Sequence, residues 1–133
     1  MNRNTGAMIL GALMILTIAG GCGANNSLAP FQPEVNNSAD NFQMQATAVK
    51  NTSTTLEYNW SNSGTTANVN QATTFTSGTA NLAIFDSQNA QVYIHNLNDN
   101  GTYTTTSGVA GTWRIVVQLN NYGGTLNFRV QKP

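Results

Sequence analysis

The clearest structural signal in the chain is the stretch Thr112-Trp113-Arg114-Ile115-Val116-Val117-Gln118-Leu119. Apolar side chains stand at every second position of this stretch, from Trp113 to Leu119. A period of two is the signature of a β-strand that buries one of its faces. The stretch therefore predicts a strand, with Trp113 at the start of its buried face.

The same alternation recurs in shorter runs from residue 41 to the end of the chain. The apolar positions of these runs are Phe42, Met44, Ala46 and Ala48; Leu56, Tyr58 and Trp60; Ala67 and Val69; Ala80, Leu82 and Ile84; Val92 and Ile94; Tyr103; and Leu126, Phe128 and Val130. Turn-forming residues separate the runs, at Asn62-Ser63-Gly64, Ser77-Gly78, Ser87-Gln88-Asn89, Asn100-Gly101, Ala110-Gly111 and Tyr122-Gly123-Gly124. This spacing, with no helical period, predicts an all-β fold: an antiparallel β-sandwich of seven or eight strands, jelly-roll or immunoglobulin-like.

The last two runs are expected to form a hairpin, with Asn120–Gly124 as the loop between Thr112–Leu119 and Thr125–Gln131. Gly111-Thr112-Trp113-Arg114-Ile115-Val116-Val117, followed by Gly124-Thr125-Leu126-Asn127-Phe128, resembles the final hairpin of jelly-roll accessory domains. Such domains are the pre-peptidase C-terminal domain and the P-domain of subtilisin-like proteases. The resemblance implies a fold and not an activity, because sandwiches carry many unrelated functions.

The first 21 residues have the three-part layout of an export signal. Arg3 gives a charged start, Ala7–Ala19 is an apolar segment, and Gly20 and Gly21 lead into Cys22. The apolar segment is shorter than the roughly 17–25 residues that a membrane-spanning helix needs. Residues 1–21 are therefore expected to be a signal-peptide helix that is removed on export.

The segment Ile18-Ala19-Gly20-Gly21-Cys22 resembles the lipobox of bacterial lipoproteins. The resemblance implies cleavage before Cys22 and a diacylglycerol and acyl modification, such as palmitate, that anchors the protein to a membrane of the cell envelope. It also implies the outer membrane in a diderm source, because Gly23 stands where an Asp would signal inner-membrane retention. The whole mature chain looks like small bacterial lipoproteins with such a sandwich. The alternative is an ordinary secretory signal followed by a free cysteine.

A linker composition marks residues 22–40, the lipidated cysteine and an expected flexible tether. Gly23–Asp40 contains Pro30 and Pro33, four Asn and no apolar period. Its apolar residues Phe31 and Val35 are candidates for docking on the edge of the domain. The β-sandwich domain is expected to occupy residues 41–133.

Charge is scarce along the chain, with five basic and five acidic residues among 133. Removal of Arg3 with the signal leaves four basic and five acidic residues, a net charge near −1. Phosphate-backbone binding needs a basic surface, so nucleic acid is not an expected partner. The polar surface must come from uncharged side chains, mainly the 20 Asn and 18 Thr.

Neither a catalytic site nor a cofactor is expected from the titratable residues. His95 is the only histidine, and alternation with Val92 and Ile94 points it and Tyr93 outward. No second His or Cys stands at metal-ligand spacing. Asn96–Gly101 resembles the start of a calcium loop, but a hairpin turn with Asn100-Gly101 at its tip is favoured. A weak calcium site using Asp99, or Asp86 from another loop, is the alternative.

Aromatic residues give the only candidate ligand surface. Trp60 and Trp113 lie on apolar faces and are expected in the core. Tyr93 falls on the polar face of its expected strand, and Tyr103 and Tyr122 lie near turns. Exposed tyrosine rings beside amides suit recognition of polysaccharide or protein, because rings stack while amides form hydrogen bonds.

The sequence thus predicts a lipid-anchored envelope protein that acts as a non-catalytic binding or interaction module. Its partner would be an envelope protein or a polysaccharide, and the sequence does not define its oligomeric state. The alternative is a structural or assembly subunit of an envelope complex. A remote alternative is an enzyme that gathers Asp86, His95 and Arg114 in one cleft.

Overall fold

The computed structural model describes residues 32–133, and these residues form strands joined by turns, bends and irregular loops, without a helix. Seven strands run antiparallel to their neighbours, so the predicted all-β fold is confirmed. They are β1 (Glu34–Ser38), β2 (Asn41–Asn62), β3 (Asn68–Gln71), β4 (Thr74–Phe85), β5 (Gln91–Asn96), β6 (Gly101–Thr104) and β7 (Gly111–Gln131). The expected signal-peptide helix, Cys22 and Phe31 lie outside the described residues.

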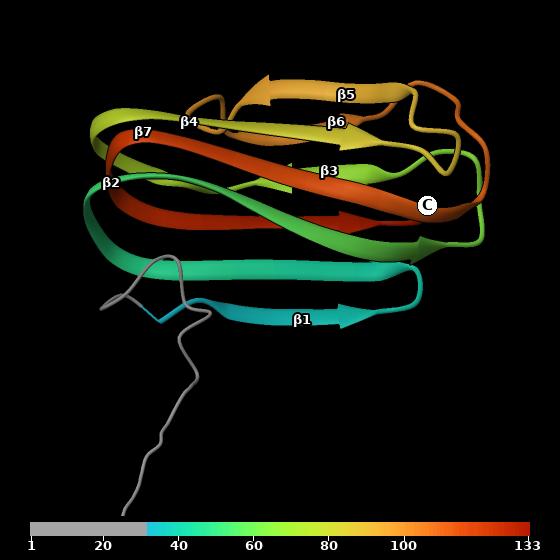
Figure 1. Cartoon of the computed structure of the whole chain (residues 1–133), viewed down its shortest axis with the longest axis horizontal. Helices are drawn as coiled ribbons and strands as arrows, with labels where there is room; N and C mark the ends of the chain where they lie inside the picture. The colour runs from blue at the N-terminus through green and yellow to red at the C-terminus, as the bar shows by residue number, and fades with distance from the viewer. Residues whose placement is uncertain (1–31) are drawn as a thin grey trace, which may run out of the picture.

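Two long strands organise the sheet. β2 has 22 residues, β7 has 21, and they pair from Asn41 opposite Gln131 to Asn62 opposite Gly111. Both strands curve, so that the continuous sheet folds over on itself as a sandwich (Figure 1). The first half-sheet contains β1, residues 41–46 of β2, 126–131 of β7, β3 and β6. The second half-sheet contains residues 54–62 of β2, 111–119 of β7, 79–85 of β4, and β5.

The curved part of the sheet is a series of bulges. The β2–β7 register shifts three times between Ala46 and Thr54, and the β4–β7 register shifts between Phe75 and Thr79. Gly78 has a φ of 71° and Asn121 a φ of 48°, conformations in which a strand bends sharply.

The expected hairpin at Asn120–Gly124 is therefore wrong. Residues 112–119 and 125–131 do not pair with each other, because both belong to β7 and pair with β2 and β4. The turn expected at Ser77-Gly78 likewise lies inside β4. Asn and Gly supply the positive φ that a turn requires, but a bulge in a bent strand uses the same residues.

The sandwich also begins earlier than expected. Glu34–Ser38 forms β1, which pairs with β2 and places Val35 opposite Met44, whereas the sequence assigned this segment to the tether. Every residue of β1 is exposed at the edge of the sheet. An exposed edge strand needs no apolar alternation, so its sequence looks like a linker.

The core fills the space between the half-sheets. Its largest side chains include Trp60 and Trp113, whose rings meet edge to face with centroids 6.0 Å apart. The indole nitrogen of Trp113 donates to the carbonyl of Val109 at 2.8 Å, and that of Trp60 donates to the carbonyl of Ser38 at 3.1 Å. Both tryptophans are in the core, as predicted.

Gly78→Ala should destabilise the fold severely. A Cβ at Gly78 would collide with the backbone of Asn120 and Asn121 in β7. The φ of Gly78 is also one that residues other than Gly rarely adopt. We expect a loss of about 3 kcal/mol or more in the free energy of unfolding, measured by urea denaturation. Gly64→Ala is the control, because its Cβ would meet only side-chain atoms: the flexible Lys132 side chain at 3.2 Å, and Oδ1 of Asn62 at an ordinary contact distance of 3.5 Å. Equal free energies of unfolding for the two variants would contradict the close contact between Gly78 and β7 at the bend.

Candidate functional site

The three tyrosines proposed as a ligand surface do not form one exposed platform. Tyr122 is fully buried at the bend, where its hydroxyl donates to the carbonyl of Thr74 at 2.7 Å. Burial raises the pKa of Tyr122 to about 12. Tyr93 is only 6% exposed, and Tyr103 is half-buried. The rings of Tyr93 and Tyr103 lie 6.5 Å apart, so only these two belong together.

A bulge explains why Tyr93 turned out to be buried. Ile84 pairs with Tyr93 and Phe85 with Gln91, which leaves Val92 without an opposite residue. The extra residue reverses the alternation, so that Val92 and Tyr93 are both buried and Ile94 is 58% exposed. The expected outward orientation of Tyr93 is therefore wrong.

The edge cluster, made of Gln71, Tyr93, His95 and Tyr103, lies where β5 of one half-sheet meets β6 of the other. The His95 ring stacks on Tyr93 at 5.0 Å and contacts Tyr103 at 4.3 Å, measured between ring centroids. The Tyr93 hydroxyl donates to Oε1 of buried Gln71 at 2.6 Å. Desolvation, with smaller effects of Tyr103 and Asp99, raises the pKa of Tyr93 well above its ordinary value. The cluster closes this edge of the sandwich, and the Tyr93 hydroxyl is already used in its hydrogen bond to Gln71.

Asp86 holds the turn between β4 and β5. Its Oδ1 accepts the backbone N–H groups of Gln88 and Ala90, and its Oδ2 accepts that of Val109, each at 2.9 Å. These bonds, above all the one from Ala90, hold the pKa of Asp86 below its ordinary value against an opposing effect of burial.

Asp99, the other candidate calcium ligand, is exposed on the next turn of the chain. Its backbone carbonyl accepts Nε2 of Gln71 at 2.8 Å and the hydroxyl of Tyr103 at 3.0 Å. Within residues 32–133, no three His, Cys, Asp or Glu side chains gather in a way that could hold a metal ion. The weak calcium site therefore gains no cluster of ligands from this part of the chain.

Arg114 makes contacts on the outer face of the second half-sheet. Its guanidinium lies 4.3 Å from the centre of the Phe85 ring and donates to Oδ1 of Asn89 at 2.8 Å. It also lies 3.7 Å from a carboxylate oxygen of Glu57. Asp86, His95 and Arg114 thus engage three different sets of neighbours.

The outer face of the first half-sheet carries almost only uncharged polar side chains. The strand register aligns them in rows across β1, β2, β7, β3 and β6. We call this surface the amide face, and its members are Glu34, Asn36, Ser38, Asn41, Gln43, Gln45, Asn68, Asn70, Thr102, Thr104, Asn127, Arg129 and Gln131. The buried residues between them, such as Met44 and Phe128, point to the core.

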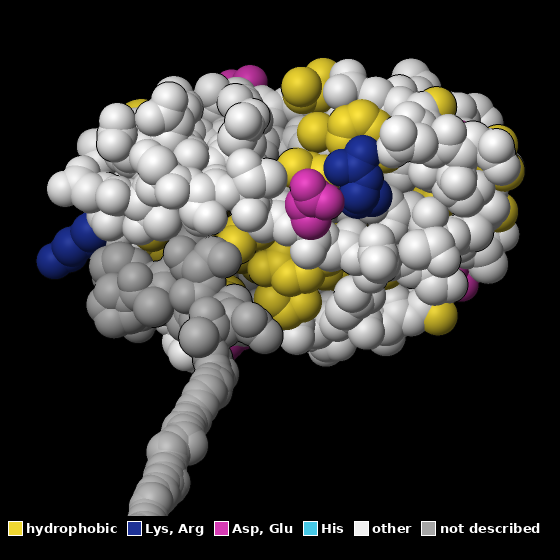
Figure 2. Space-filling view, in the orientation of Figure 1, with side chains coloured by type: hydrophobic (Ala, Val, Ile, Leu, Met, Phe, Trp, Pro, Cys, Tyr) yellow, Lys and Arg dark blue, Asp and Glu magenta, His cyan; other side chains and the backbone are white. Residues whose placement is uncertain are grey.

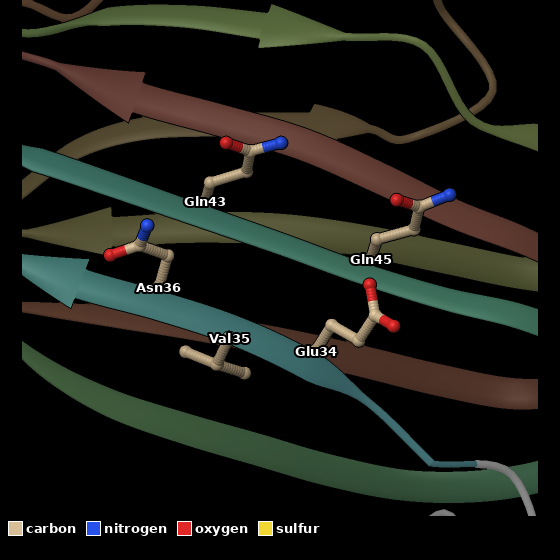
Figure 3. Close-up of a pocket in the computed structure, with 5 residues that line it drawn as sticks. All are labelled: Glu34, Val35, Asn36, Gln43 and Gln45. Carbon is tan, nitrogen blue, oxygen red and sulfur yellow. The ribbon is translucent and has the colours of Figure 1, made fainter.

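A cavity of about 210 Å³ lies at the β1 end of the amide face. Glu34, Asn36, Gln43 and Gln45 line it from one side of β1 and β2, whereas Val35 points to the opposite side (Figure 3). Asn36 stands opposite Gln43, and Glu34 opposite Gln45. None of these four polar side chains forms a hydrogen bond to another group within residues 32–133.

Two amides elsewhere in residues 32–133 are, by contrast, occupied. Oδ1 and Nδ2 of Asn100 bond the backbone of Thr73 at 2.9 and 3.0 Å, and Gln71 bonds three groups of the edge region. The amides at the cavity have no such partners and are available to a ligand, as are other exposed amides such as Gln118 on the second half-sheet. Sequence reasoning missed them because β1 resembles a linker, and the register was needed to align its residues with Gln43 and Gln45.

No protein-family model matches this chain, and no curated protein matches it. Within residues 32–133, there is no helix long and apolar enough to cross a membrane. The proposals that follow rest on the residues of this chain and their contacts.

Asp86→Asn should lower the melting temperature by a few degrees at neutral pH, because the neutral amide cannot accept all three N–H groups as well. The pKa of Asp86 in the folded state lies below its ordinary value. The ionised carboxylate therefore stabilises the fold fully when the pH is above the ordinary pKa. This contribution is lost as pH falls through the lowered pKa. The difference in melting temperature between the variant and the wild type should therefore decrease in acid. The measurement is thermal unfolding at a series of pH values from neutral downward.

Exposed Asp99→Asn is the control and should leave the melting temperature unchanged. A gap for Asp86→Asn that appears only with added calcium would contradict the hydrogen-bonding role and assign Asp86 to a metal.

Proposed function

We propose that this chain is a lipid-anchored protein of the bacterial cell envelope whose β-sandwich binds a partner without catalysing a reaction. The observation that carries the proposal is the sequence up to Cys22: a charged start, a short apolar segment, and Ile18-Ala19-Gly20-Gly21-Cys22. Cys22 is also the only cysteine, so it has no partner for an intrachain disulfide.

The early start of the sandwich shortens the expected tether. Eleven residues separate Cys22 from Glu34, where β1 begins. Fully extended, they span at most about 40 Å. Two or more acyl chains give stable attachment, since each buried CH₂ contributes about 0.8 kcal/mol. On this proposal, the domain stays within reach of one membrane surface.

A binding role is supported by how the polar groups of the domain are used. Asp86 holds a turn, His95 stacks on Tyr93 and contacts Tyr103, and Arg114 contacts Phe85, Asn89 and Glu57. Catalysis requires such groups to converge on one reacting atom. The amide face instead offers many neutral hydrogen-bond donors and acceptors, which suit binding rather than catalysis.

Cys22→Ser should release the protein from membranes and abolish incorporation of labelled palmitate, because serine has no thiol to accept the diacylglycerol. The measurement is fractionation of cells that express the full chain, followed by detection of the label. Ser27→Ala, in the same segment, is the control and should keep both the label and the membrane fraction. Unchanged partitioning of Cys22→Ser would falsify the anchor.

A structural or assembly subunit is the second candidate, and the outer face of the second half-sheet favours it. The register aligns Val116, Ala83 and Ile94 in one row, and Ile94 is 58% exposed. Figure 2 shows hydrophobic side chains gathered around a neighbouring basic and acidic side chain on this side of the molecule. Exposed apolar surface of this kind is typical of protein contacts.

A photo-crosslinking residue in place of Ile94, in intact membranes, should yield an adduct with a second copy or another envelope protein if this face is an assembly surface. The same residue in place of Gln43, on the amide face, is the control and should give no such adduct. Recovery of only the monomer from the Ile94 position would count against assembly through this face.

A further inference from the structure

We infer that the amide face binds a neutral polysaccharide, and that the cavity over the outer face of β1 and β2 holds one sugar unit of the polymer. The inference rests on the proposed binding function and names its ligand class. It follows from the chemistry, availability and spacing of the groups on this face.

The chemistry of the face matches a polyhydroxylated ligand. Eleven of its thirteen side chains are Asn, Gln, Ser or Thr. Each amide offers two donors and one acceptor oxygen, and each hydroxyl both donates and accepts. A sugar presents neighbouring hydroxyls that also donate and accept, so paired amides such as Asn36 and Gln43 complement it.

The amides at the cavity are available and well placed. Gln43 and Gln45 are only partly exposed, and both line the cavity (Figure 3). Their backbone is held in the centre of a paired strand, between β1 and β7. A rigid strand reduces the ordering cost of binding, which otherwise weakens polar recognition.

The spacing of the rows suits a repeating polymer. One row runs over five strands, from Asn36 through Gln43, Arg129 and Asn70 to Thr102. Neighbouring strands lie about 4.8 Å apart, so the row presents a polar group at regular short intervals. A linear glycan, with hydroxyls on every unit, can use successive positions of such a row.

Other ligand classes fit this face less well. Protein contacts depend on buried aromatic, apolar or Arg anchors, and Arg129 is the one such side chain among the thirteen. Nucleic acid needs several cations, whereas here Arg129 is balanced by Glu34. The second half-sheet, with exposed Ile94, has the apolar surface that this face lacks.

The test uses the detergent-solubilised full chain on an array of neutral and acidic oligosaccharides. We expect binding to neutral oligosaccharides that changes little between low and high salt, since no ion pair is involved. Gln43→Ala with Gln45→Ala should weaken it about tenfold or more, equivalent to about 1.4 kcal/mol. Gln118→Ala is the matched control, because Gln118 is an exposed amide on the outer face of the other half-sheet.

A second variant, Gln45→Ala alone, and thermal unfolding of each protein separate lost binding from lost folding. The inference is overturned if no neutral oligosaccharide is bound, or if the double variant binds as well as Gln118→Ala. In that event, release of Cys22→Ser from membranes and a protein adduct at Ile94 would still support an anchored binding protein of a different kind. Binding of acidic oligosaccharides alone, lost at high salt, would also overturn a neutral ligand.

Discussion

The pairing of β2 with β7 is the interaction on which the rest of the structure depends. These strands stay in contact from Asn41–Gln131 to Asn62–Gly111, and they pass together through the bend. The other strands join this ribbon directly or through one neighbour: β1 on β2, β3 and β4 on β7, β6 on β3 and β5 on β4. Because one ribbon serves both half-sheets, the bulges that bend it also close the sandwich over Trp60, Trp113 and the other core side chains.

The fold also separates two outer faces with different chemistry. Alternation along β2 and β7 sends every second side chain outward, and the bend turns the two halves of each strand to opposite sides of the molecule (Figure 1). The first half of β2 presents Gln43 and Gln45, whereas the part of β7 in the second half-sheet presents Arg114 and Val116. The same two strands therefore supply a neutral polar face and a partly apolar one, without any additional domain.

The fold class could be predicted from the sequence because alternation is a local property. Trp113–Leu119 needs only its own residues to be read as a strand with a buried face. Connectivity is not local. Asn121 and Gly124 adopt a positive φ in a bent strand, and the same residue types would do so in a hairpin loop. The bulge at Val92 has no sequence signal either, and one extra residue was enough to exchange the exposures of Tyr93 and Ile94. The amide face could not be predicted because it depends on the register between segments far apart in the sequence, such as Asn41 with Gln131 and Gln45 with Asn127.

The location of the aromatic side chains changes what kind of recognition the domain can support. Tyr93 and Tyr122 are buried, so stacking of rings on a sugar cannot provide most of the binding energy at the amide face. Neutral hydrogen bonds contribute only about 0.5–1.5 kcal/mol each, because they replace bonds to water. A single unit would then bind weakly, and useful affinity requires many units on one polymer. In the proposed function, a lipid anchor at Cys22 would supply the other half of that requirement, because only eleven residues separate Cys22 from β1 and the face would be held at high effective concentration beside polymers fixed in the same envelope. The two proposals, weak neutral contacts and a membrane anchor, are therefore complementary: each would supply what the other lacks.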